Sequence, residues 1–349
     1  MTQDRKIWVS AVALALIHAV VLGAAWVVPY DPAEQNRDFP FAPPMRIHFV
    51  DSIGMFHFRP FVYLWVNRSS DGVSARYEED HSKMLPLQFF IRADQRRDAG
   101  NPRGAWHLFG VPSPGRVFLL GTDDYGRDQF SRLLYGGQVS LFAGLLAATL
   151  SLGLGFLLGG ISGYFGSWLD DVIMRGAEVF MALPWIYLLF GARAFLPLHM
   201  GPRETFVLLI STIGLTAWAR PARLVRGIVL SAKQRDYVRA ARGFGGSWTY
   251  VLRRHVLPET FPVVLTQAAI VIPRYILAEV TLSFLGLGMG EPVPSWGNML
   301  AGLQRYYVLE SYWWMFSSAL ALVPVFLFYH WLADALQSRL ASAESRFAG

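Results

Sequence analysis

Six apolar stretches of about membrane-spanning length constrain the fold of this chain more than any other feature of its sequence. A helix rises about 1.5 Å per residue, so roughly 20 apolar residues cross a hydrocarbon core of about 30 Å. The pattern predicts an all-α polytopic membrane protein with six transmembrane helices. The stretches are residues 7–28, 139–165, 172–196, 205–219, 261–285 and 314–332.

The composition agrees with a membrane protein and excludes several kinds of site. Of the 349 residues, 53% are hydrophobic and only 16% are charged, against roughly 25% charged in ordinary soluble domains. The chain has no cysteine, which excludes disulfides, cysteine-ligated metals and cysteine nucleophiles.

The first apolar stretch could also be a cleaved signal peptide. It follows the charged residues Asp4, Arg5 and Lys6 and is interrupted only by Ser10 and His18. Signal peptides usually have only 7 to 15 apolar residues. The longer stretch here favours an uncleaved first transmembrane helix, so residues 1–28 are expected to form an N-terminal segment and one helix.

Residues 29–136 differ in character from the rest of the chain. Their charges balance, turn-forming residues are frequent, and short strand-like runs occur between them. We therefore expect a folded, β-containing insertion between the first and second helices, followed by a membrane core of five helices at residues 137–349. The strand-like runs are residues 45–50, 56–66, 87–92 and 116–120.

The loop at residues 220–260 carries most of the excess positive charge. Between Arg220 and Arg254 there are nine Arg or Lys residues and one acid, Asp236. Basic loops face the cytoplasm in membrane proteins, which places both termini in the cytoplasm and the insertion outside. No nucleic-acid-binding motif accompanies the charge, so membrane orientation explains it better than a nucleic-acid partner.

Two sequence features predict local helix geometry within the membrane core. Gly155, Gly159 and Gly163 recur every four residues and give one helix face small residues, which permits close contact with another helix. Pro184 lies inside the third apolar stretch, where a kink is expected.

The motifs of common enzyme sites are missing from the sequence. There is no Gly-x-x-x-x-Gly-Lys-Ser/Thr loop, and the only lysines are Lys6, Lys83 and Lys233, so this chain has no P-loop nucleotide site. His-Glu-x-x-His and Gly-x-Ser-x-Gly are also absent. We therefore expect neither a catalytic site nor a bound cofactor or metal in this chain.

The basic loop is expected to contain two short helices. Asp236 can cap a helix at residues 237–242 that ends at Gly243 and Gly245, and Ser247 can cap a second helix at 248–255 that ends by Pro258. Helices this short are marginal alone in water and persist only when docked. The small residues Ala240 and Ala241 would permit such docking; a solvated connector is the alternative.

Several motifs of this sequence resemble one known family. Residues 237–245, with His255, Leu257 and Pro258, resemble the Glu-Ala-Ala loop of binding-protein-dependent ABC importer permeases. Residues 120–128 resemble the element before the second helix in the dipeptide, oligopeptide and nickel permeases, and further matches lie at 163–166, 279–288 and 294–297. The resemblance runs from Leu120 to the C-terminus. The residues of the 120–128 motif are Gly121, Thr122, Asp123, Gly126, Arg127 and Asp128.

The resemblance implies a type I ABC importer permease fold in the cytoplasmic (inner) membrane. It implies import of peptides or a related small solute, with nickel or another non-peptide solute as the alternative. The implied partners are a second permease subunit in a heterodimer, two ATPase subunits that hold ATP and Mg²⁺, and an extracytoplasmic substrate-binding protein. The loop would be the coupling helix in the ATPase groove, formed by Asp236, Tyr237, Arg239, Ala240, Ala241, Gly245, His255, Leu257 and Pro258.

The chain departs from the family pattern at two places. Arg239 stands where the family usually has Glu, and a cation in the first turn of a helix costs about 0.3–1 kcal/mol against the helix dipole. The insertion at residues 29–136 is longer than in the shorter members, so its role cannot be transferred from them.

Arg274 and Glu279 are charged residues inside the fifth apolar stretch. Such groups are unfavourable at membrane depth and usually face the protein interior or a water-filled path. Five residues apart, they lie about 140° apart around a helix and are not expected to pair with each other. They are candidates for the translocation pathway, with structural pairing to neighbouring helices as the alternative.

Two competing functions belong to other classes. A membrane enzyme would need an active site in the insertion, where His48, His57, His81 and His107 are candidates by location alone. A receptor or scaffold would keep the permease fold without transporting a solute.

Overall fold

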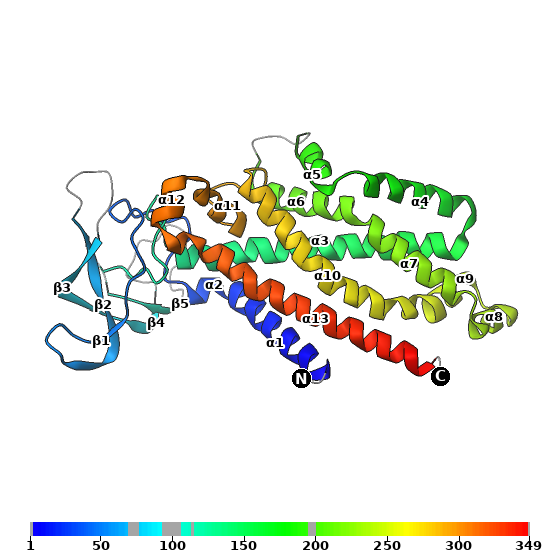
Figure 1. The fold of residues 1–349 in the computed structure, drawn as a ribbon, viewed down its shortest axis with the longest axis horizontal. Coiled ribbons are helices and arrows are strands. Elements are labelled where there is room, and N and C mark those ends of the chain that lie inside the picture. Colours follow the sequence, from blue (N-terminus) through cyan, green and yellow to red (C-terminus); the bar gives the residue numbers. More distant parts are fainter. Residues whose placement is uncertain (1–2, 69–76, 93–105, 113–114, 195–199, 348–349) are drawn as a thin grey trace. The chain divides into compact units, whose positions relative to one another are not determined.

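The computed structural model describes residues 3–68, 77–92, 106–112, 115–194 and 200–347. Most of these residues are helical, and five strands lie between the first two long helices in the sequence (Figure 1). The chain forms two compact units. Unit 1 comprises Met1–Leu14, Leu141–Glu279 and Pro324–Gly349, and unit 2 comprises Ala15–Ser140 and Val280–Val323.

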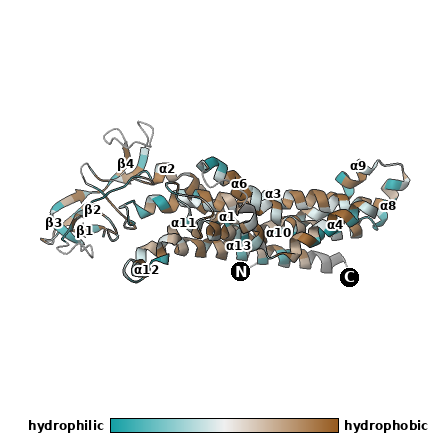
Figure 2. Cartoon of the chain, turned by 90° about the horizontal axis from the view of Figure 1, so that it is seen from above, coloured by the Kyte–Doolittle hydropathy of each residue, from teal (hydrophilic) through white to brown (hydrophobic). Residues whose placement is uncertain are grey.

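Within the described residues, 4 helical stretches are long and apolar enough to cross a membrane, as their hydropathy in Figure 2 illustrates. A fifth span results if α6 (Pro202–Ala217) and α7 (Ala219–Ala232), which are bent by 44°, cross together. The predicted number of six transmembrane helices is therefore not confirmed. The 4 stretches are α1 (Gln3–Leu22), α3 (Gln129–Phe165), Trp248–Phe284, which contains α10 (Leu257–Phe284), and Trp313–Ser342, which overlaps α13 (Ser317–Phe347).

The predicted third span is two helices instead of one kinked helix. It consists of α4 (Ser167–Ala182) and α5 (Trp185–Ala194), which have 16 and 10 residues, while residues 195–196 of the prediction lie outside the described part. Leu183 has extended backbone angles of φ −84° and ψ 134°. Proline lacks an N–H and disfavours a helical conformation in the residue before it, so Pro184 ends the helix at this point.

In unit 1, α3 packs closely against α7 through the predicted glycine face. A Cβ on Gly159 would overlap the backbone of Ala222, and one on Gly163 would lie 2.9 Å from the carbonyl oxygen of Arg226. A Cβ on Gly155 would overlap Pro221 in the same way. The prediction of close helix contact through these three glycines is confirmed.

The same helix α3 also contacts α10 in unit 1. A Cβ on Gly144 would lie 2.9 Å from the backbone nitrogen of Ile276. About two turns further along α3, the hydroxyls of Ser151 and Tyr275 are hydrogen-bonded at 2.9 Å. Helix α3 is therefore the shared support for α7 and α10.

Unit 2 contains two small antiparallel sheets. One has the order β1-β2-β3 and the other pairs β4 with β5. Phe61 of β2 pairs with Pro86 of β3, and Phe89 of β4 pairs with Phe109 of β5. The strands are β1 (His48–Val50), β2 (Phe56–Asn67), β3 (Tyr77–Pro86), β4 (Gln88–Arg92) and β5 (Trp106–Gly110).

Strands occur at three of the four predicted strand-like runs, but not at residues 116–120. Val117 and Phe118 are instead fully buried in a core cluster with Tyr30, Met45 and Val62. Their apolar side chains therefore reflect packing of an irregular segment and not a strand. Residues 69–76, 93–105 and 113–114 of the predicted insertion lie outside the described part.

The segment after α10 contributes two short helices and two 3-10 turns to unit 2. Helices α11 (Trp296–Ala301) and α12 (Tyr306–Ser311) are joined and followed by short 3-10 turns. Trp314, in the last of these turns, is buried with Val308 and Met315 and donates a hydrogen bond of 3.0 Å from its indole to the Thr122 carbonyl oxygen. At the other end of the unit's sequence, the short helix α2 (Ala24–Val27) contacts β5.

Candidate functional site

The first part of the predicted loop at residues 220–260 is not a loop, because residues 220–232 belong to helix α7. The basic loop of unit 1 follows α7, and its first element is helix α8 (Asp236–Gly243) (Figure 1). Its N-cap residue is Arg235, without a side-chain cap, so the prediction that Asp236 caps this helix is wrong. Asp236 is the first residue of the helix, where a negative charge still favours the helix dipole. The end agrees with the prediction, because Gly245 has a φ of +83° that favours glycine.

The second half of the loop differs from the sequence expectation. The Ser247 side chain caps α9 (Trp248–Val251) by accepting a hydrogen bond of 3.3 Å from the Tyr250 backbone nitrogen, as predicted. The helix does not end at Pro258, however. It passes through a π-helical turn, Leu252–Val256, directly into α10.

The π-helical turn explains how Pro258 is accommodated. The backbone N–H of Leu257 bonds the carbonyl oxygen of Leu252, five residues back, which locally widens the helix. Pro258 has no N–H to donate and its ring needs space beside the preceding turn. The predicted end of the helix at Pro258 is therefore wrong, and the segment from α9 to Glu279 is continuous.

Helix α8 is held in place by one buried face. Val238 is 0% exposed and packs with Val225 and Val229 of α7 and with Val251 and Val256. Because eight helical residues are too few for stability alone, this packing is what maintains α8.

The two alanines of the predicted docking site have different environments. Ala241 is half-buried and lies against the same apolar cluster, whereas Ala240 is exposed. Only Ala240 is therefore fully available to a partner; Ala241 already contributes to contacts within the chain.

The outer face of the loop is aromatic and cationic. Phe244 is 92% exposed, and Tyr237, Trp248 and Tyr250 are also exposed. We call these four residues, with the exposed Arg239, Arg242, Arg253 and Arg254, the coupling surface. His255 lies half-buried beside it, with its ring centroid 5.4 Å from that of Tyr250.

Phe244 was missed by the sequence prediction. The sequence contains an indication that Phe244 is a contact residue, because this large apolar residue stands between Gly243 and Gly245 in an otherwise polar loop. Exposed aromatic residues are enriched at protein–protein interfaces.

A polar network secures the helix ends beneath α8. The Lys233 ammonium, directly after α7, donates hydrogen bonds to the carbonyl oxygens of Gly163 and Tyr164 at 3.1 and 2.6 Å. Arg226 binds Asp170 through two hydrogen bonds of 2.5 Å, and these bonds hold the pKa of the Asp170 carboxyl below its usual value. The network joins α3, α4 and α7.

The two candidate pathway residues occupy different environments on α10. Glu279 is 0% exposed, whereas Arg274 is exposed. The ion pairs of the described residues do not include one between them, in line with their separation around the helix. A second exposed arginine, Arg220, lies just after the bend between α6 and α7.

The 120–128 motif is a compact turn in unit 2. Gly121 and Gly126 have φ values of +72° and +70°, and a Cβ on Gly121 would lie 2.6 Å from the Ala42 carbonyl oxygen. The Thr122 hydroxyl accepts a hydrogen bond of 2.7 Å from the Ala42 nitrogen. These positions require glycine because of both backbone conformation and close approach.

The charged residues of the motif connect segments distant in sequence. Asp123 accepts a hydrogen bond of 2.6 Å from the Arg127 Nε. Arg127 and Arg132, both buried, bind the carboxylate of Glu291, which follows α10. The pKa of Glu291 is lowered by the Arg132 and Arg127 guanidiniums against the opposing effect of burial.

Asp128 caps the start of α3. Its carboxylate accepts hydrogen bonds from the backbone nitrogen and the hydroxyl of Ser131, at 2.8 and 2.6 Å. Burial raises the pKa of Asp128 to about 6, although the bonds from Ser131 act in the opposite direction. The motif therefore fixes the first turn of α3 and the segment after α10 within unit 2.

Three of the four histidines of the insertion, His48, His57 and His81, lie against the rings of Phe61 and Tyr63. His48 pairs with Glu79 at 3.3 Å, and His57 pairs with Asp51 at 3.0 Å. His107 contacts the Val28 carbonyl oxygen, and the His81 ring lies against Tyr63. In the described part of the chain, no group of three or more His, Asp or Glu residues could hold a metal ion.

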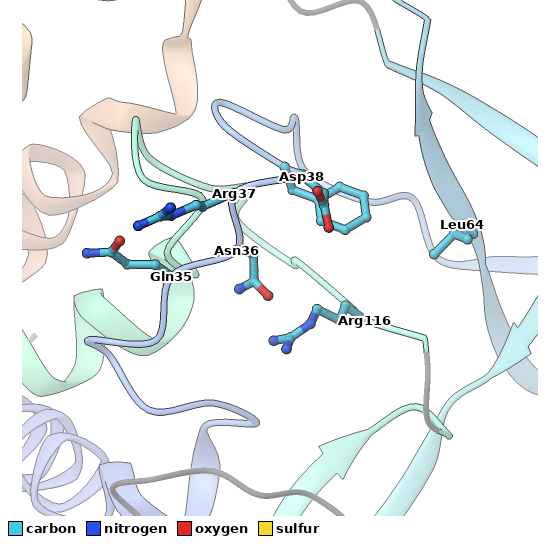
Figure 3. Close-up of a pocket in the computed structure, with 7 residues that line it drawn as sticks. Gln35, Asn36, Arg37, Asp38, Leu64 and Arg116 are labelled. Atoms are coloured by element: carbon cyan, nitrogen blue, oxygen red, sulfur yellow. The ribbon is translucent and has the colours of Figure 1, made fainter.

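Unit 2 also contains a polar cavity of about 450 Å³ (Figure 3). Asn36 there donates a hydrogen bond of 3.1 Å to the Gly126 carbonyl oxygen, and Arg116 pairs with Glu34 at 2.6 Å. The polar groups of these two side chains thus serve the packing of the unit. The cavity is lined by Gln35, Asn36, Arg37, Asp38, Phe39, Leu64 and Arg116.

Comparison with known proteins identifies relatives over about two thirds of the chain. The dipeptide transport system permease protein DppC of Bacillus subtilis (strain 168) is 37% identical over 229 residues, which cover 65% of this chain and 69% of the relative. A protein of Brucella suis biovar 1 (strain 1330), provisionally named a peptide transport system permease, is 37% identical over 244 residues, covering 69% and 79%. Among solved structures, the inward-facing MetNI methionine ABC transporter matches 60% of this chain and 96% of its own, at 19% identity and a TM-score of 0.47.

A family model gives the most direct assignment. Residues 155–342 match the family described as "Binding-protein-dependent transport system inner membrane component". The matched segment includes the coupling surface, Arg274 and Glu279. The chain belongs to this family of inner membrane components of binding-protein-dependent transport systems.

Proposed function

We propose that this ABC importer component forms half of the translocation pathway of a peptide importer, and that a second, non-identical permease subunit forms the other half. The relatives that carry peptide-permease names are 37% identical over about two thirds of the chain, which supports peptides as the solute. Nickel or another non-peptide solute is the alternative within the same family.

The observation that carries the proposal is the continuity between the coupling surface and α10. Trp248 and Tyr250 belong to α9, which passes through the π-helical turn into the membrane helix that bears Arg274 and Glu279. A movement imposed on the coupling surface would therefore displace the charged part of α10 without an intervening loop. Closure of the ATPase subunits could drive alternating access in this way.

The partners follow from this function. Two ATPase subunits would hold ATP and Mg²⁺, so this chain would need no cofactor of its own. One of these subunits would receive α8 in a groove. The groove should present an acidic side chain toward Arg239, because that arginine is exposed and replaces the usual Glu. Buried or rim charges at interfaces select their partner by complementarity.

The orientation follows from the basic loop. The coupling surface and both termini would be cytoplasmic, since positively charged loops remain inside. Residues 29–136 would then be extracytoplasmic, where unit 2 could contact the substrate-binding protein.

Reconstitution with the second permease, the ATPases and the binding protein tests the proposal. Uptake of a peptide such as trialanine, driven by ATP and dependent on the binding protein, is the expected result. Uptake of nickel in place of peptides would select the alternative solute. ATPase stimulation by the loaded binding protein without uptake of any solute would favour a receptor.

A further inference from the structure

Two arginines of unit 1, Arg220 and Arg274, lie within candidate membrane spans. Arg274 belongs to the candidate span Trp248–Phe284, about 15 Å along the helix from Phe284 at 1.5 Å per residue. Arg220 lies at the bend of the candidate span formed by α6 and α7. Both are exposed, and the ion pairs of the described residues include neither of them.

Helix α3 contacts the immediate sequence neighbours of both arginines. Ser151 of α3 bonds Tyr275, the neighbour of Arg274, at 2.9 Å. Gly155, one turn further along the same face, contacts Pro221, the neighbour of Arg220. Residues four apart on a helix share one face and are about 6 Å apart along its axis, so α10 and α7 meet α3 at adjacent positions right beside these arginines.

No ion pair of the described residues joins either arginine to an acid. The nearest acid of α10, Glu279, is buried and lies about 140° around the helix from Arg274. Of the acids on α4, which contacts α7, Asp170 is engaged by Arg226. Among the described residues, neither Asp171 nor Glu178 forms an ion pair with Arg220 or Arg274.

Two exposed guanidiniums at membrane depth require an anion or water. Arginine facing lipid is strongly disfavoured, whereas arginine lining a polar path is common. A guanidinium binds a carboxylate through two parallel hydrogen bonds, which makes it selective for this group. A bare divalent cation such as Ni²⁺ would be repelled by the same pair of charges.

We infer that Arg220 and Arg274 form an anion-binding station in the translocation pathway and that the transported solute carries a carboxylate there. The station deepens the proposed function and rests on it, because it assigns the face that bears these arginines to the pathway. It excludes bare nickel as the solute and fits a peptide, which has a carboxylate at its C-terminus. Arg220 and Arg274 determine specificity for the solute and do not take part in ATP hydrolysis.

The test uses the full transporter with its binding protein and three probes. The probes are trialanine, trialanine amide, and alanyl-alanyl-aspartic acid α-amide, which has only a side-chain carboxylate. For each probe, the uptake of a variant is divided by that of the wild type, which cancels the preference of the binding protein. The variants are Arg274→Gln, Arg220→Gln and the charge-retaining Arg274→Lys, with Arg223→Gln on the same helix as the matched control.

The expected result is a loss specific to carboxylate probes. Arg274→Gln and Arg220→Gln should reduce uptake of trialanine at least tenfold while uptake of trialanine amide stays within twofold. Arg274→Lys should retain part of the trialanine uptake, and Arg223→Gln should behave as the wild type. If the aspartate probe follows trialanine, the station accepts any carboxylate; if it follows the amide, the station reads the C-terminus.

Other outcomes would overturn the station. Equal losses for trialanine and its amide, with reduced co-purification of the second permease, would mean that the arginines pair with an acid of the other subunit. Wild-type uptake of both probes by Arg274→Gln would remove this residue from the pathway.

A second measurement separates the station from the proposed function. If the wild type imports no peptide at all, the proposed function fails. The unfolding temperature of the purified transporter is then measured with trialanine and with its amide. A rise with trialanine alone, absent in Arg274→Gln, would still support the station, because a ligand stabilises the state that binds it. No rise would overturn it.

Discussion

The ammonium of Lys233 donates a hydrogen bond of 2.6 Å to the carbonyl oxygen of Tyr164. This bond joins the end of α7 to the last turn of α3 directly beneath the cluster that holds α8, in which Tyr164 is a buried member. Carbonyl groups at the end of a helix have no partner within the helix. Lys233 thus satisfies two of them and fixes the base of the coupling surface.

Replacing Lys233 tests this support. In Lys233→Met, the Gly163 and Tyr164 carbonyls lose a charged donor, which is worth about 1.5–3 kcal/mol of unfolding free energy. Thermal unfolding in detergent should show this loss of stability. Peptide uptake, normalised to the amount of expressed transporter, should also fall. Lys233→Arg keeps a cationic donor and should be milder. Equal stability of Lys233→Met and the wild type would show that the bond does not support the loop.

The contact between α3 and α7 predicts opposite effects at two glycines of the same helix. A Cβ on Gly159 would overlap the backbone of Ala222, whereas nothing lies within 4 Å of a Cβ on Gly153. Gly159→Ala should lower the free energy of unfolding by about 1–3 kcal/mol because the helices must separate. Gly153→Ala should be neutral, or stabilising by up to about 1 kcal/mol from helix propensity. Equal unfolding temperatures for the two variants would contradict the close contact.

The buried cap residue Asp128 predicts a pH dependence of stability. Its pKa of about 6 in the folded chain exceeds the value of about 3.9 expected when unfolded. The folded chain therefore holds more protons between pH 4 and 6, and this group lowers the free energy of unfolding as the pH rises through that window. Above about pH 7 its contribution is constant.

Asp128→Asn removes this titration while keeping an oxygen that can cap α3. The difference in unfolding free energy between the variant and the wild type should therefore change from pH 4 to 6 and be flat from 7 to 8. Unfolding curves recorded in detergent at these pH values measure it. Parallel pH profiles for both proteins would show that Asp128 does not titrate in this range.

Glu279 is predicted to matter more for transport than for assembly. It is fully buried in α10, the helix that continues from the coupling surface, and a buried acid in a moving helix is sensitive to its surroundings. Glu279→Gln keeps the shape of the side chain and removes its charge. Uptake should fall severalfold while co-purification of the partner subunits is retained. Equal losses of both would favour a structural role.

The sequence was sufficient for features that depend on neighbouring residues. The glycine face of α3, the end of α8 at Gly243 with Gly245 just beyond it, and the cap at Ser247 are set by spacing and local backbone conformation, and all agree with the structure. The prediction at Pro258 was wrong because proline usually ends a helix, and a π-helical turn that accommodates it has no simple sequence signal.

Features that depend on tertiary contacts were not predictable in this way. The apolar run at 116–120 has strand-like residues, but its burial by Tyr30 and Met45 does not require a strand. Arg127 and Glu291 are far apart in the sequence, so their ion pair leaves no periodic pattern. The contacts of Pro221 and Tyr275, the neighbours of Arg220 and Arg274, with one face of α3 likewise arise only from the packing of α7 and α10 on that helix.

Ala241 and Gly245 both support the structure of the loop itself, so substitutions there do not test the coupling role alone. Ala241→Asp would place a charge against the apolar cluster beneath α8, and Gly245→Asp would strain a backbone with a φ of +83°. Both variants should lose ATPase binding, but partly through damage to the loop itself. Ala240→Asp and Phe244→Ala change only exposed groups and therefore test the surface alone.

The most direct test of the account is co-purification of the ATPase with Phe244→Ala, measured together with peptide uptake. Loss of an exposed aromatic anchor typically weakens an interface by 2 kcal/mol or more, roughly thirtyfold in affinity. Tyr306→Ala, which removes an exposed aromatic of unit 2, is the matched control. The account predicts that Phe244→Ala inserts normally, loses its ATPase and imports no peptide, while Tyr306→Ala retains the ATPase. Wild-type co-purification and uptake in Phe244→Ala and Ala240→Asp would mean that the loop is only a connector, which would contradict the coupling role.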